Sequence, residues 1–336
     1  MGKKISKKKK VRRKRIIKVI VIALIILAVL CAGAFGAVYY ILGNLNTVDI
    51  TKDDSELGID ADRADRSDDK ITNIALFGVD TRDMSKDSGR SDAIMVLTID
   101  EKGNAIKMTS ILRDSKVAIE GHGEEKITHA YAYGGPTLAI KTINQNFDMD
   151  IKDYITVNFS QLAEIVDSVG GITMDVTAQE VAQINKNAAD GSVLTGSGKL
   201  ELNGAQAVSY TRIRKIDSDN ARADRQQKVL NAVFQKLAKM PKTEYPGVIR
   251  QFLGIVETSL DYGDIIGYTT SSLIRKGFYT EQYTIPDSRY ETDLWGGIDS
   301  GGAWVWVYNL DNAAARLHQI VYGEDGAADA SGETTE

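Results

Sequence analysis

Cysteine and histidine, the usual nucleophiles and transition-metal ligands, are almost absent from this chain. Of its 336 residues, one is cysteine and three are histidine. The single cysteine, Cys31, lies in an apolar run, so the rest of the chain uses neither a disulfide nor thiolate chemistry. His122 and His129 stand seven positions apart with no cysteine and no HExxH pattern, which argues against a zinc site.

Several sequence motifs that depend on glycine are also missing. The chain contains no GxSxG nucleophile elbow, no Walker loop and no GxGxxG dinucleotide fingerprint. It has no internal repeat either. These absences exclude the commonest sequence signatures of serine hydrolases, P-loop enzymes and NAD-dependent enzymes.

Acidic residues are missing from the first 18 positions, which hold eleven lysines or arginines. Because the whole chain has a formal net charge of −5, the remainder carries −16. Residues 19–42 are 24 uncharged, mostly apolar residues, and a transmembrane helix needs about 20. The positive-inside rule then predicts a single-pass cell-membrane protein with a basic cytoplasmic tail at 1–18 and an extracellular C-terminal domain.

Three other interpretations of the N-terminal region compete with this membrane anchor. A cleaved signal peptide has an apolar stretch of roughly 7–15 residues, which is shorter than this one. A lipoprotein site at Cys31 would follow small residues, but Val29 and Leu30 precede it. A nucleic-acid role for the basic block is the third alternative. The length of the apolar run favours the anchor. A lipid bilayer is therefore an expected partner, and binding to nucleic acid is not expected.

Two polar segments bracket the part of the chain that is expected to fold. Residues 43–70 lack apolar periodicity and are interpreted as an acidic spacer, and residues 323–336 as a disordered acidic tail. The folded extracytoplasmic domain is therefore predicted over residues 71–322.

Short apolar runs alternate with helical patterns within this domain. Strands are expected at 72–79, 93–100, 105–112, 154–159, 172–176 and 279–285, with a turn at 101–104. Helices are expected at 136–147, 161–169, 204–210, 222–239, 247–260, 264–277 and 311–321. Ser160 can cap the second helix and Gly170-Gly171 can end it. Mixed hairpins and crossovers predict an α/β domain in which helices cover a mixed β-sheet in three layers (α/β/α).

Carboxylates stand at two of the expected strand ends. The segment GVDTRDMSKDSGRSD (78–92) joins the first two strands, so Asp80 follows one strand and Asp92 begins the next. Two carboxylates beside open space suit Mg²⁺, which prefers a few oxygen ligands and keeps several waters. The alternative is that both are ordinary turn residues, because aspartate is favoured in turns.

An arginine follows the third expected strand. Arg113, in SILRDS (110–115), would project near the edge that holds the two aspartates if the strands are adjacent. The alternative is a solvated charge at a strand end.

The strongest signal is the arginine-rich run YTRIRKIDSDNARADRQQKVLNAVFQKL (210–237). Arg212 and Arg214 are two positions apart, so they face the same way in an extended segment. Arg222, Arg225 and Gln226 fall on one helical stripe. This stripe continues into the apolar residues Val229, Leu230, Val233, Phe234 and Leu237.

Because the apolar part of this stripe must face a core, its arginines are expected to face inward as well. Buried guanidinium groups need anionic partners, and arginine is matched to bidentate phosphate binding. Internal salt bridges to Asp217, Asp219 and Asp224 are the competing explanation.

Taken in order, these segments resemble the LytR-CpsA-Psr family of cell-envelope proteins. The matching features are the basic tail and single span, then FGVDTR, RSDAIMVLTID, MTSILRDS, KITHAYAYGG, VNFSQLAEIVDSVGGITMDV, LNGAQAVSYTRIR and RADRQQKVL. The resemblance implies a membrane-anchored phosphotransferase that moves an anionic glycopolymer, such as teichoic acid or capsular polysaccharide, from a polyprenyl-pyrophosphate carrier to peptidoglycan. It also implies a helix-covered sheet with an apolar groove for the polyprenyl chain.

The resemblance implies roles for individual residues. Asp80 and Asp92 resemble the family's magnesium ligands, while Arg113, Arg212 and Arg214 resemble its pyrophosphate-binding arginines. Further candidates for substrate binding are Arg82, Arg90, Lys126, Arg222, Arg225, Gln226 and Gln227. Of these, Lys126 is either a phosphate contact or simply a loop lysine.

The chain departs from the family pattern at one point. Some members have a further arginine shortly after the LRD arginine, whereas this chain reads SKVAIEG with Val117. Either Lys116 substitutes for that arginine or the site has one cation fewer. Ile111, Val157, Phe159 and Leu162 are examples of residues that would line an apolar tunnel, and each is equally compatible with an ordinary core.

These observations lead to a hypothesis of phosphoryl transfer without a covalent enzyme intermediate. Mg²⁺ on the two aspartates would bridge the pyrophosphate, and the arginines would stabilise charge that grows on the leaving lipid phosphate. A peptidoglycan hydroxyl would attack the phosphorus that bears the sugar, with either Asp80 or Asp114 taking the proton. The alternatives are a polyprenyl-phosphate-binding regulator without turnover, and a pyrophosphatase that releases the polymer to water.

Overall fold

The computed structural model describes residues 47–61, 63, 70–81, 89–213, 219–241, 244–270 and 279–323. The chain divides into two units, 1–45 and 46–336, and all the helices and strands named below belong to the second. The predicted basic tail (1–18), the predicted transmembrane helix (19–42) and residues 324–336 of the predicted acidic tail lie outside the described residues. Within the described ranges, none of the helices has the length and apolar character needed to span a bilayer.

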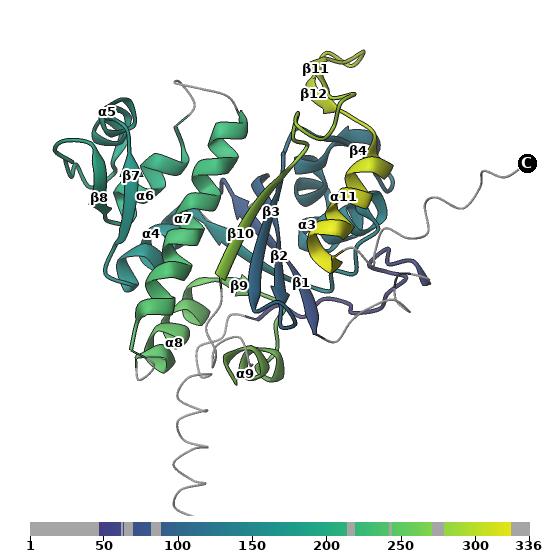
Figure 1. Cartoon of the computed structure of the whole chain (residues 1–336). Helices are drawn as coiled ribbons and strands as arrows, with labels where there is room; N and C mark the ends of the chain where they lie inside the picture. Colours follow the sequence, from purple (N-terminus) through teal and green to yellow (C-terminus); the bar gives the residue numbers. More distant parts are fainter. Residues whose placement is uncertain are drawn as a thin grey trace, which may run out of the picture. The chain divides into compact units, whose positions relative to one another are not determined.

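A six-stranded mixed β-sheet forms the centre of this unit (Figure 1). Its order is β10 (Tyr279–Ile285), β3 (Ala105–Ile111), β2 (Ser91–Asp100), β1 (Ile71–Val79), β6 (Asp153–Asn158) and β9 (Glu257–Thr258). The pairs β1–β2, β2–β3 and β6–β9 are antiparallel, whereas β1–β6 and β3–β10 are parallel. The predicted mixed sheet is therefore confirmed.

The central strands are buried on both faces. Leu76 and Phe77 are neighbours on β1 that point to opposite sides of the sheet, and both are buried. Strands of this kind read as continuous apolar runs, because helices cover the two faces. This is why the runs at 72–79 and 93–100 were recognisable as strands.

Helices α3 (Ile127–Phe147) and α11 (Leu310–Tyr322) pack together on one core (Figure 1). Buried residues of β1 and β2, such as Phe77, pack in the same core with Ile143 of α3 and Leu317 of α11. Helix α3 begins nine residues before the predicted start at Pro136. The helix is kinked at Gly134 and Gly135, the latter with φ 62°, so the predicted helix is its second half.

A second core is built from α4 (Phe159–Ser168), α5 (Ala178–Asn187), α6 (Gly204–Thr211), α7 (Asp219–Lys239) and the pair β7 (Ile172–Val176) and β8 (Gly198–Leu202). Val166, Ile172, Val229 and Val233 are buried in it. Helix α7 also lies against β3 and β10, and α4 lies against β6. Helices α8 (Tyr245–Ile255) and α9 (Tyr262–Thr270) follow along the chain.

Several predicted element boundaries are wrong. The N-cap of α4 is Asn158, which accepts the N–H of Gln161 at 2.9 Å, and Ser160 lies inside the first turn. Glycines with φ 75° and 81° at 170 and 171 follow α4, which confirms its predicted end. The helix predicted at 247–260 ends at Ile255, and Glu257–Thr258 instead pair with β6. Of the helix predicted at 264–277, residues 271–277 lie outside the described residues.

Two single elements and two hairpins were not predicted. They are α5, β8, the hairpin β4 (Lys116–Ile119) and β5 (Gly123–Lys126), and the hairpin β11 (Trp295–Ile298) and β12 (Trp304–Val307).

Part of the expected acidic spacer is packed against the domain. Leu57 is fully buried, Ile59 is nearly so, and both belong to the core that contains α3. The side chain of Asn144 on α3 donates to the carbonyl of Leu57 at 2.9 Å. Residues near 57–59 therefore contribute to the core in addition to linking it to the preceding chain.

Candidate functional site

The ends of β1 and β2 bring two aspartates together. Val79 on β1 pairs with Ser91 on β2, so Asp80 lies just after one strand end and Asp92 just inside the next. The main-chain N–H groups of both aspartates donate to the carbonyl of Arg90, at 3.3 and 3.0 Å. The main chains of the two aspartates are therefore adjacent, as the strand order predicted.

The carboxylate of Asp92 is buried between two arginines. Arg113 Nη1 lies 2.7 Å from Oδ1, and Arg222 Nη2 lies 2.9 Å from Oδ2. The side chains of Asp92 and Arg222 are 9% and 4% exposed, and that of Arg113 is 25% exposed. Burial alone would raise the pKa of Asp92, but the charges and hydrogen bonds of Arg222 and Arg113 hold it below its ordinary value. Asp92 is therefore ionised, and it fixes two guanidinium groups from distant parts of the sequence.

Lys126 joins this cluster through Asp114. Its Nζ lies 2.9 Å from Asp114 Oδ1, and Arg113 Nε lies 3.3 Å from Asp114 Oδ2. Lys116, which could replace the missing family arginine, pairs with Glu124 at 3.2 Å and lies 3.8 Å from Asp299.

Arg225 faces inward, as its place on the helical stripe predicted, but it is held by an acid that the sequence did not suggest. Its Nε lies 2.9 Å from Glu180 on α5, and its Nη1 donates to the carbonyl of Ile213 at 3.3 Å. Burial would raise the pKa of Glu180. Hydrogen bonds from the main-chain N–H of Thr177 and from the Arg225 side chain outweigh burial and lower it.

The competing salt-bridge explanation can be tested only at Asp224, because the side chains of Asp217 and Asp219 are not described. Arg222 and Arg225 are both in ion pairs, with Asp92 and Glu180. Asp224 pairs with Lys228 at 2.6 Å, Asp217 lies outside the described residues, and the Asp219 side chain is not described. The two arginines are thus partly structural.

Arg212 differs from these arginines. It caps the C-terminal end of α6, its side chain is exposed, and its guanidinium carbon lies 4.7 Å from the ring centroid of Phe159. No carboxylate within the described ranges lies within 4.0 Å of it. Arg212 is therefore free to bind an anion in a way that Arg113, Arg222 and Arg225 are not.

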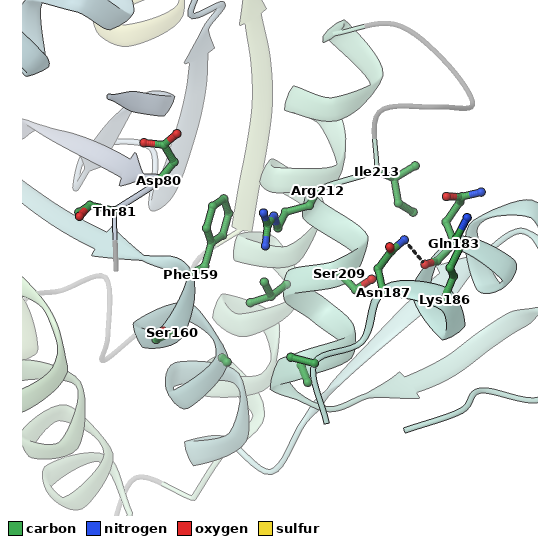
Figure 2. Close-up of a pocket in the computed structure, with 14 residues that line it drawn as sticks. Asp80, Thr81, Phe159, Ser160, Gln183, Lys186, Asn187, Ser209, Arg212 and Ile213 are labelled. Carbon is green, nitrogen blue, oxygen red and sulfur yellow. Dashed lines mark hydrogen bonds between the residues drawn. The ribbon is translucent and has the colours of Figure 1, made fainter. Parts of the chain in front are cut away.

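A cleft of about 790 Å³ opens beside Arg212 (Figure 2). Asp80 and Thr81 line it on one side, and side chains of α4, α5 and α6 line the remainder. Figure 2 shows Phe159 and Arg212 in the middle of this cleft, between Asp80 and the amides of Gln183 and Asn187. The wall opposite Asp80 is made of amide, hydroxyl and lysine side chains from Gln183, Lys186, Asn187 and Ser209.

The sequence could have indicated this wall. Thr177 and Glu180 form a capping box at the start of α5, a signature that can be read from the T-x-x-E spacing. Recognition of that box would have predicted the helix that supplies Glu180, Gln183 and Lys186.

A small apolar cavity of about 50 Å³ lies between the sheet and the helices α4 and α7. Among the proposed tunnel residues, Val157, Phe159 and Leu162 line it. Ile111 packs in the other core, with Phe77 and Ile143, so its proposed place in the tunnel is not supported.

The two glutamines of α7 have different surroundings. Gln226 lines both the apolar cavity and a smaller one beside Asp92 and Arg113. Gln227 is buried and its amide donates to the carbonyl of Tyr283 on β10, which ties α7 to the sheet. Among the remaining candidates, the side chain of Arg90 is exposed, and Arg82 and Arg214 lie outside the described residues.

Comparisons with known proteins agree with this arrangement. The LytR_cpsA_psr family model matches residues 38–319. The chain is 34% identical over 200 residues to the polyisoprenyl-teichoic acid--peptidoglycan teichoic acid transferase TagT of Bacillus subtilis (strain 168), covering 58% of this chain and 62% of that protein. It is 38% identical over 192 residues to the TagU transferase of Bacillus cereus (strain AH820), covering 56% and 60%. The matches thus span about three fifths of these relatives.

Solved structures extend the comparison over more of the chain. The structure of TagT bound to LI-WTA superposes with a TM-score of 0.64 at 26% sequence identity. The superposition covers 82% of this chain and 99% of that one. The fold around the site is therefore the same in the two proteins.

Proposed function

The chain belongs to the LytR_cpsA_psr family, and from this premise we propose that it is a glycopolymer phosphotransferase. It transfers an anionic polymer of the teichoic acid or capsular type from a polyprenyl-pyrophosphate carrier to peptidoglycan. The names of its relatives TagT and TagU, which are transferases of teichoic acid to peptidoglycan, support the reaction class and both substrates.

One observation supports the proposal most strongly: cationic side chains from distant parts of the sequence gather around the carboxylates of Asp92 and Asp114. Arg113 and Arg222 are fixed on Asp92 at 2.7 and 2.9 Å, and Lys126 lies close by on Asp114. Arg212, which has no carboxylate partner in the described ranges, stands in the cleft that Asp80 lines. A diphosphate matches such a group, since guanidinium groups bind phosphate oxygens bidentately.

The residues fit phosphoryl transfer by positioning and charge stabilisation. Each arginine has five N–H donors, so Arg113 can hold Asp92 and still donate to a phosphate oxygen. Arg212 lies where negative charge can be stabilised as the bond to the lipid phosphate breaks. The attacking hydroxyl of the acceptor displaces the lipid phosphate from the phosphorus that bears the sugar, and the lipid leaves as its monophosphate.

Asp80 is the better candidate for accepting the proton of that hydroxyl. It is exposed in the cleft, and no cationic side chain of the described residues pairs with it. Asp114, the other candidate, lies in ion pairs with Lys126 and Arg113, so its two carboxylate oxygens already have partners.

The site also fits Mg²⁺. Asp80 and Asp92 offer two carboxylates at neighbouring strand ends, the hard oxygen ligands that this ion prefers. Within the described part of the chain, no group of three or more His, Cys, Asp or Glu could hold a metal. Substrate oxygens and water would complete the coordination. When bound, the ion would neutralise charge on the diphosphate.

Two arginines on Asp92 repel a cation until an anion accompanies it. We therefore expect metal and diphosphate to bind together. The measurement is a Mg²⁺ titration of the full chain with and without polyprenyl diphosphate, and tight binding of Mg²⁺ to the chain alone would contradict this part of the proposal.

The carrier's lipid chain and the apolar N-terminal segment belong to the same proposal. The apolar residues Val157, Phe159 and Leu162 line the small cavity between the sheet and α7 and would contact the polyprenyl chain. Residues 19–42 would anchor the protein in the cell membrane with the folded unit outside, near its lipid-linked donor.

A ligation assay tests the function directly. The full chain in detergent micelles is incubated with a polyprenyl-pyrophosphate-linked saccharide, peptidoglycan fragments and Mg²⁺. Saccharide ligated to peptidoglycan is the expected product. Free saccharide phosphate would instead identify a pyrophosphatase, and bound but unchanged donor would identify a regulator without turnover.

A further inference from the structure

A hydrogen-bond donor that the reaction described above does not use lies beside the phosphate site. The indole N–H of Trp306, on β12, is buried and has no acceptor among the described residues. Buried polar groups in folded proteins are usually hydrogen-bonded, because an unsatisfied group destabilises the fold. An unsatisfied donor at this position therefore indicates a ligand.

The hydroxyl of Ser110, on β3, is a second group of this kind. Ser110 is 2% exposed, and its hydroxyl has no partner within the described ranges. In the register Ser110 pairs with Met95, which lines the apolar cavity between the sheet and α7. Paired residues of antiparallel strands point to the same face of a sheet, so the Ser110 side chain points to the face that carries this cavity.

Trp306 and Ser110 line one small polar cavity. Its volume is about 20 Å³, and Asp92, Arg113 and Arg222 line it as well. A cavity needs about 10–15 Å³ to hold one water molecule. The polar cavity therefore has room for a single oxygen atom of a ligand and not for a whole phosphate group.

The charges around the polar cavity favour a negatively charged oxygen. The two oxygens of Asp92 are held by Arg113 and Arg222, and those of Asp114 by Arg113 and Lys126. Three cations face two carboxylates, which leaves a formal charge of +1. Trp306 and Ser110 add N–H and O–H donors to this surplus of positive charge.

The polar cavity adjoins the proposed lipid site. Asp92, Ala93 and Gln226 line both the polar cavity and the apolar cavity that would contact the polyprenyl chain. A lipid chain in the apolar cavity would place the phosphate that it carries beside the polar one. The phosphate that bears the sugar lies one bridging oxygen further from the lipid.

Trp306 is fixed in position without a ligand. Its main-chain N–H donates to the carbonyl of Asp114 at 2.9 Å, and Trp306 also forms a β-bridge with Ser115. The hydroxyl of Tyr308 donates to that of Ser115 at 3.0 Å, which ties the next turn of chain to the same residue. A donor that is ordered beforehand binds its ligand with little loss of entropy.

We propose that Trp306 and Ser110 form an oxyanion pocket for the lipid-side phosphate of the donor, with each side chain donating one hydrogen bond to a non-bridging oxygen. In the transfer, the acceptor oxygen bonds to the sugar-side phosphorus and its proton goes to Asp80. The bond from that phosphorus to the bridging oxygen breaks, and its electron pair stays on the lipid phosphate. The two donors stabilise the negative charge gained there. This inference rests on the proposed transferase function.

The indole N–H signals of the chain test the inference. Each of the three tryptophans gives one signal in a proton–nitrogen NMR spectrum of the full chain in detergent micelles, and Trp306→Phe identifies the signal of Trp306. Saturating farnesyl monophosphate is expected to move that signal downfield and to slow its exchange with water. Farnesol and N-acetylglucosamine 1-phosphate are expected to leave it in place.

The contrary outcomes of this titration are distinct. An unmoved Trp306 signal in farnesyl monophosphate would show that the polar cavity holds water alone, and it would overturn the proposal. An equal shift with the sugar phosphate would overturn the assignment to the lipid-side phosphate, and an equal shift with farnesol would show that no phosphate is recognised.

Trp306→Phe also tests affinity, because it keeps an aromatic ring and removes the N–H. It is expected to raise the dissociation constant for farnesyl monophosphate about tenfold to a hundredfold, the usual effect of one hydrogen bond to a charged group. Trp295→Phe is the matched control. In the register Trp295 pairs with Val307 and Trp306 with Gly296, so the two indoles lie on opposite faces of the hairpin. Equal affinities of the two variants would refute the role of Trp306.

A second matched pair removes hydroxyl groups. The hydroxyls of Ser110 and Thr109 are both buried and without a partner among the described residues, but Thr109 does not line the polar cavity. Ser110→Ala should weaken binding of farnesyl monophosphate about tenfold, and Thr109→Val should not. Thermal unfolding checks that each variant folds, and a lower unfolding temperature of Ser110→Ala with unchanged affinity would identify Ser110 as structural and overturn its role. If Trp306→Phe does not fold, this pair and the spectrum of the unmodified chain decide.

The ligation assay separates failure of this inference from failure of the function. Trp306→Phe should have a lower kcat than Trp295→Phe, because the lost donor acts on charge that grows in the transition state. Equal kcat values in the two variants, with normal ligation by the unmodified chain, would refute the oxyanion pocket and leave the transferase standing. A shift of the Trp306 signal with farnesyl monophosphate, but no ligation, would refute the transferase and leave a pocket for lipid phosphate.

Discussion

Replacement of Arg212 by alanine should remove activity and leave the fold nearly intact. Its side chain is exposed, it stacks on Phe159 at 4.7 Å, and no carboxylate of the described residues pairs with it. A cation–π contact at an exposed position contributes about 0.5–1 kcal/mol to stability. The free energy of unfolding should therefore fall by no more than about 1 kcal/mol.

The effect on catalysis should be much larger. Loss of one preorganised donor to a developing oxyanion reduces the rate by about 10²–10³ in well-studied enzymes. Because each tenfold change in rate corresponds to about 1.4 kcal/mol, this is about 3–4 kcal/mol of transition-state stabilisation. The loss in activity should thus exceed the loss in stability several-fold.

Arg225→Ala is the matched comparison within the same arginine cluster. Its side chain is 3% exposed and holds Glu180 at 2.9 Å. Removal of one partner of a buried ion pair typically costs about 3–5 kcal/mol of stability, because the other charge is left without its counterion. Arg225→Ala should therefore unfold at a clearly lower temperature than Arg212→Ala.

The measurements are kcat/KM in the ligation assay and thermal unfolding of the full chain, for both variants and the unmodified protein. Arg212→Ala should keep the unfolding temperature within a few degrees of the unmodified protein and lose most of its transfer activity. Unfolding temperatures that fall equally in the two variants would show that Arg212 is a structural ion-pair residue. Undiminished transfer by Arg212→Ala would refute its assignment to the diphosphate.

Three further predictions concern the ion pair, the helix contact and the metal. Asp92→Asn should destabilise the domain by about 3 kcal/mol at pH 7. The pKa of Asp92 is held below its ordinary value of about 3.8, so the carboxylate stabilises above that pH and its contribution is lost as the pH falls through the folded pKa. Chemical denaturation at a series of pH values should show the difference narrowing in acid, and a constant difference would contradict this reasoning. Gly204→Ala should lose about 1–3 kcal/mol, since its Cβ would lie 2.2 Å from the carbonyl oxygen of Ala163, while Gly247→Ala, with open space around it, should be neutral or slightly stabilising by urea unfolding. A chelator should abolish transfer and added Mg²⁺ should restore it, and full activity in chelator would remove the metal from the mechanism.

The sheet could be predicted because its strands are apolar on both faces. The predicted strand at 279–285 matches β10 at both ends, and the predicted turn at 101–104 separates β2 from β3. In each case a run of β-branched or aromatic residues is bounded by turn residues, which is the signal that single-sequence reasoning detects best. The two-residue strand β9 contains no such run, and the sequence pattern therefore predicted a helix across these residues.

The start of α4 shows where local reasoning selected the wrong residue. Both Asn158 and Ser160 are good N-cap residues by type. Only Asn158 has a glutamine three positions later, and the structure contains both hydrogen bonds of that capping box. The full pattern, rather than the residue type alone, would have given the right boundary.

The part of the candidate site that lies at the ends of strands could be predicted from the sequence. Asp80 and Asp92 are adjacent because β1 and β2 form an antiparallel hairpin, and Arg113 follows because β3 pairs with β2. The partners of the helix arginines were not predictable. Arg222 is 130 residues from Asp92, and such pairings depend on how α7 packs against the sheet, which no local pattern encodes.

The ion pairs also explain how an acidic domain can bind an anionic substrate. A buried and a half-buried guanidinium group side by side would repel each other and destabilise the fold if nothing lay between them. Asp92 removes that repulsion before substrate arrives and holds Arg113 and Arg222 in one orientation. A diphosphate then meets donors that are already ordered, so little side-chain entropy is lost on binding. Because Asp92 offsets only one of the two positive charges, the cluster keeps a net attraction for phosphate even though the chain beyond residue 18 is strongly negative. The same carboxylate therefore serves stability and preorganisation, whereas Arg212, which has no such partner in the described ranges, is left to respond to the charge that develops during transfer.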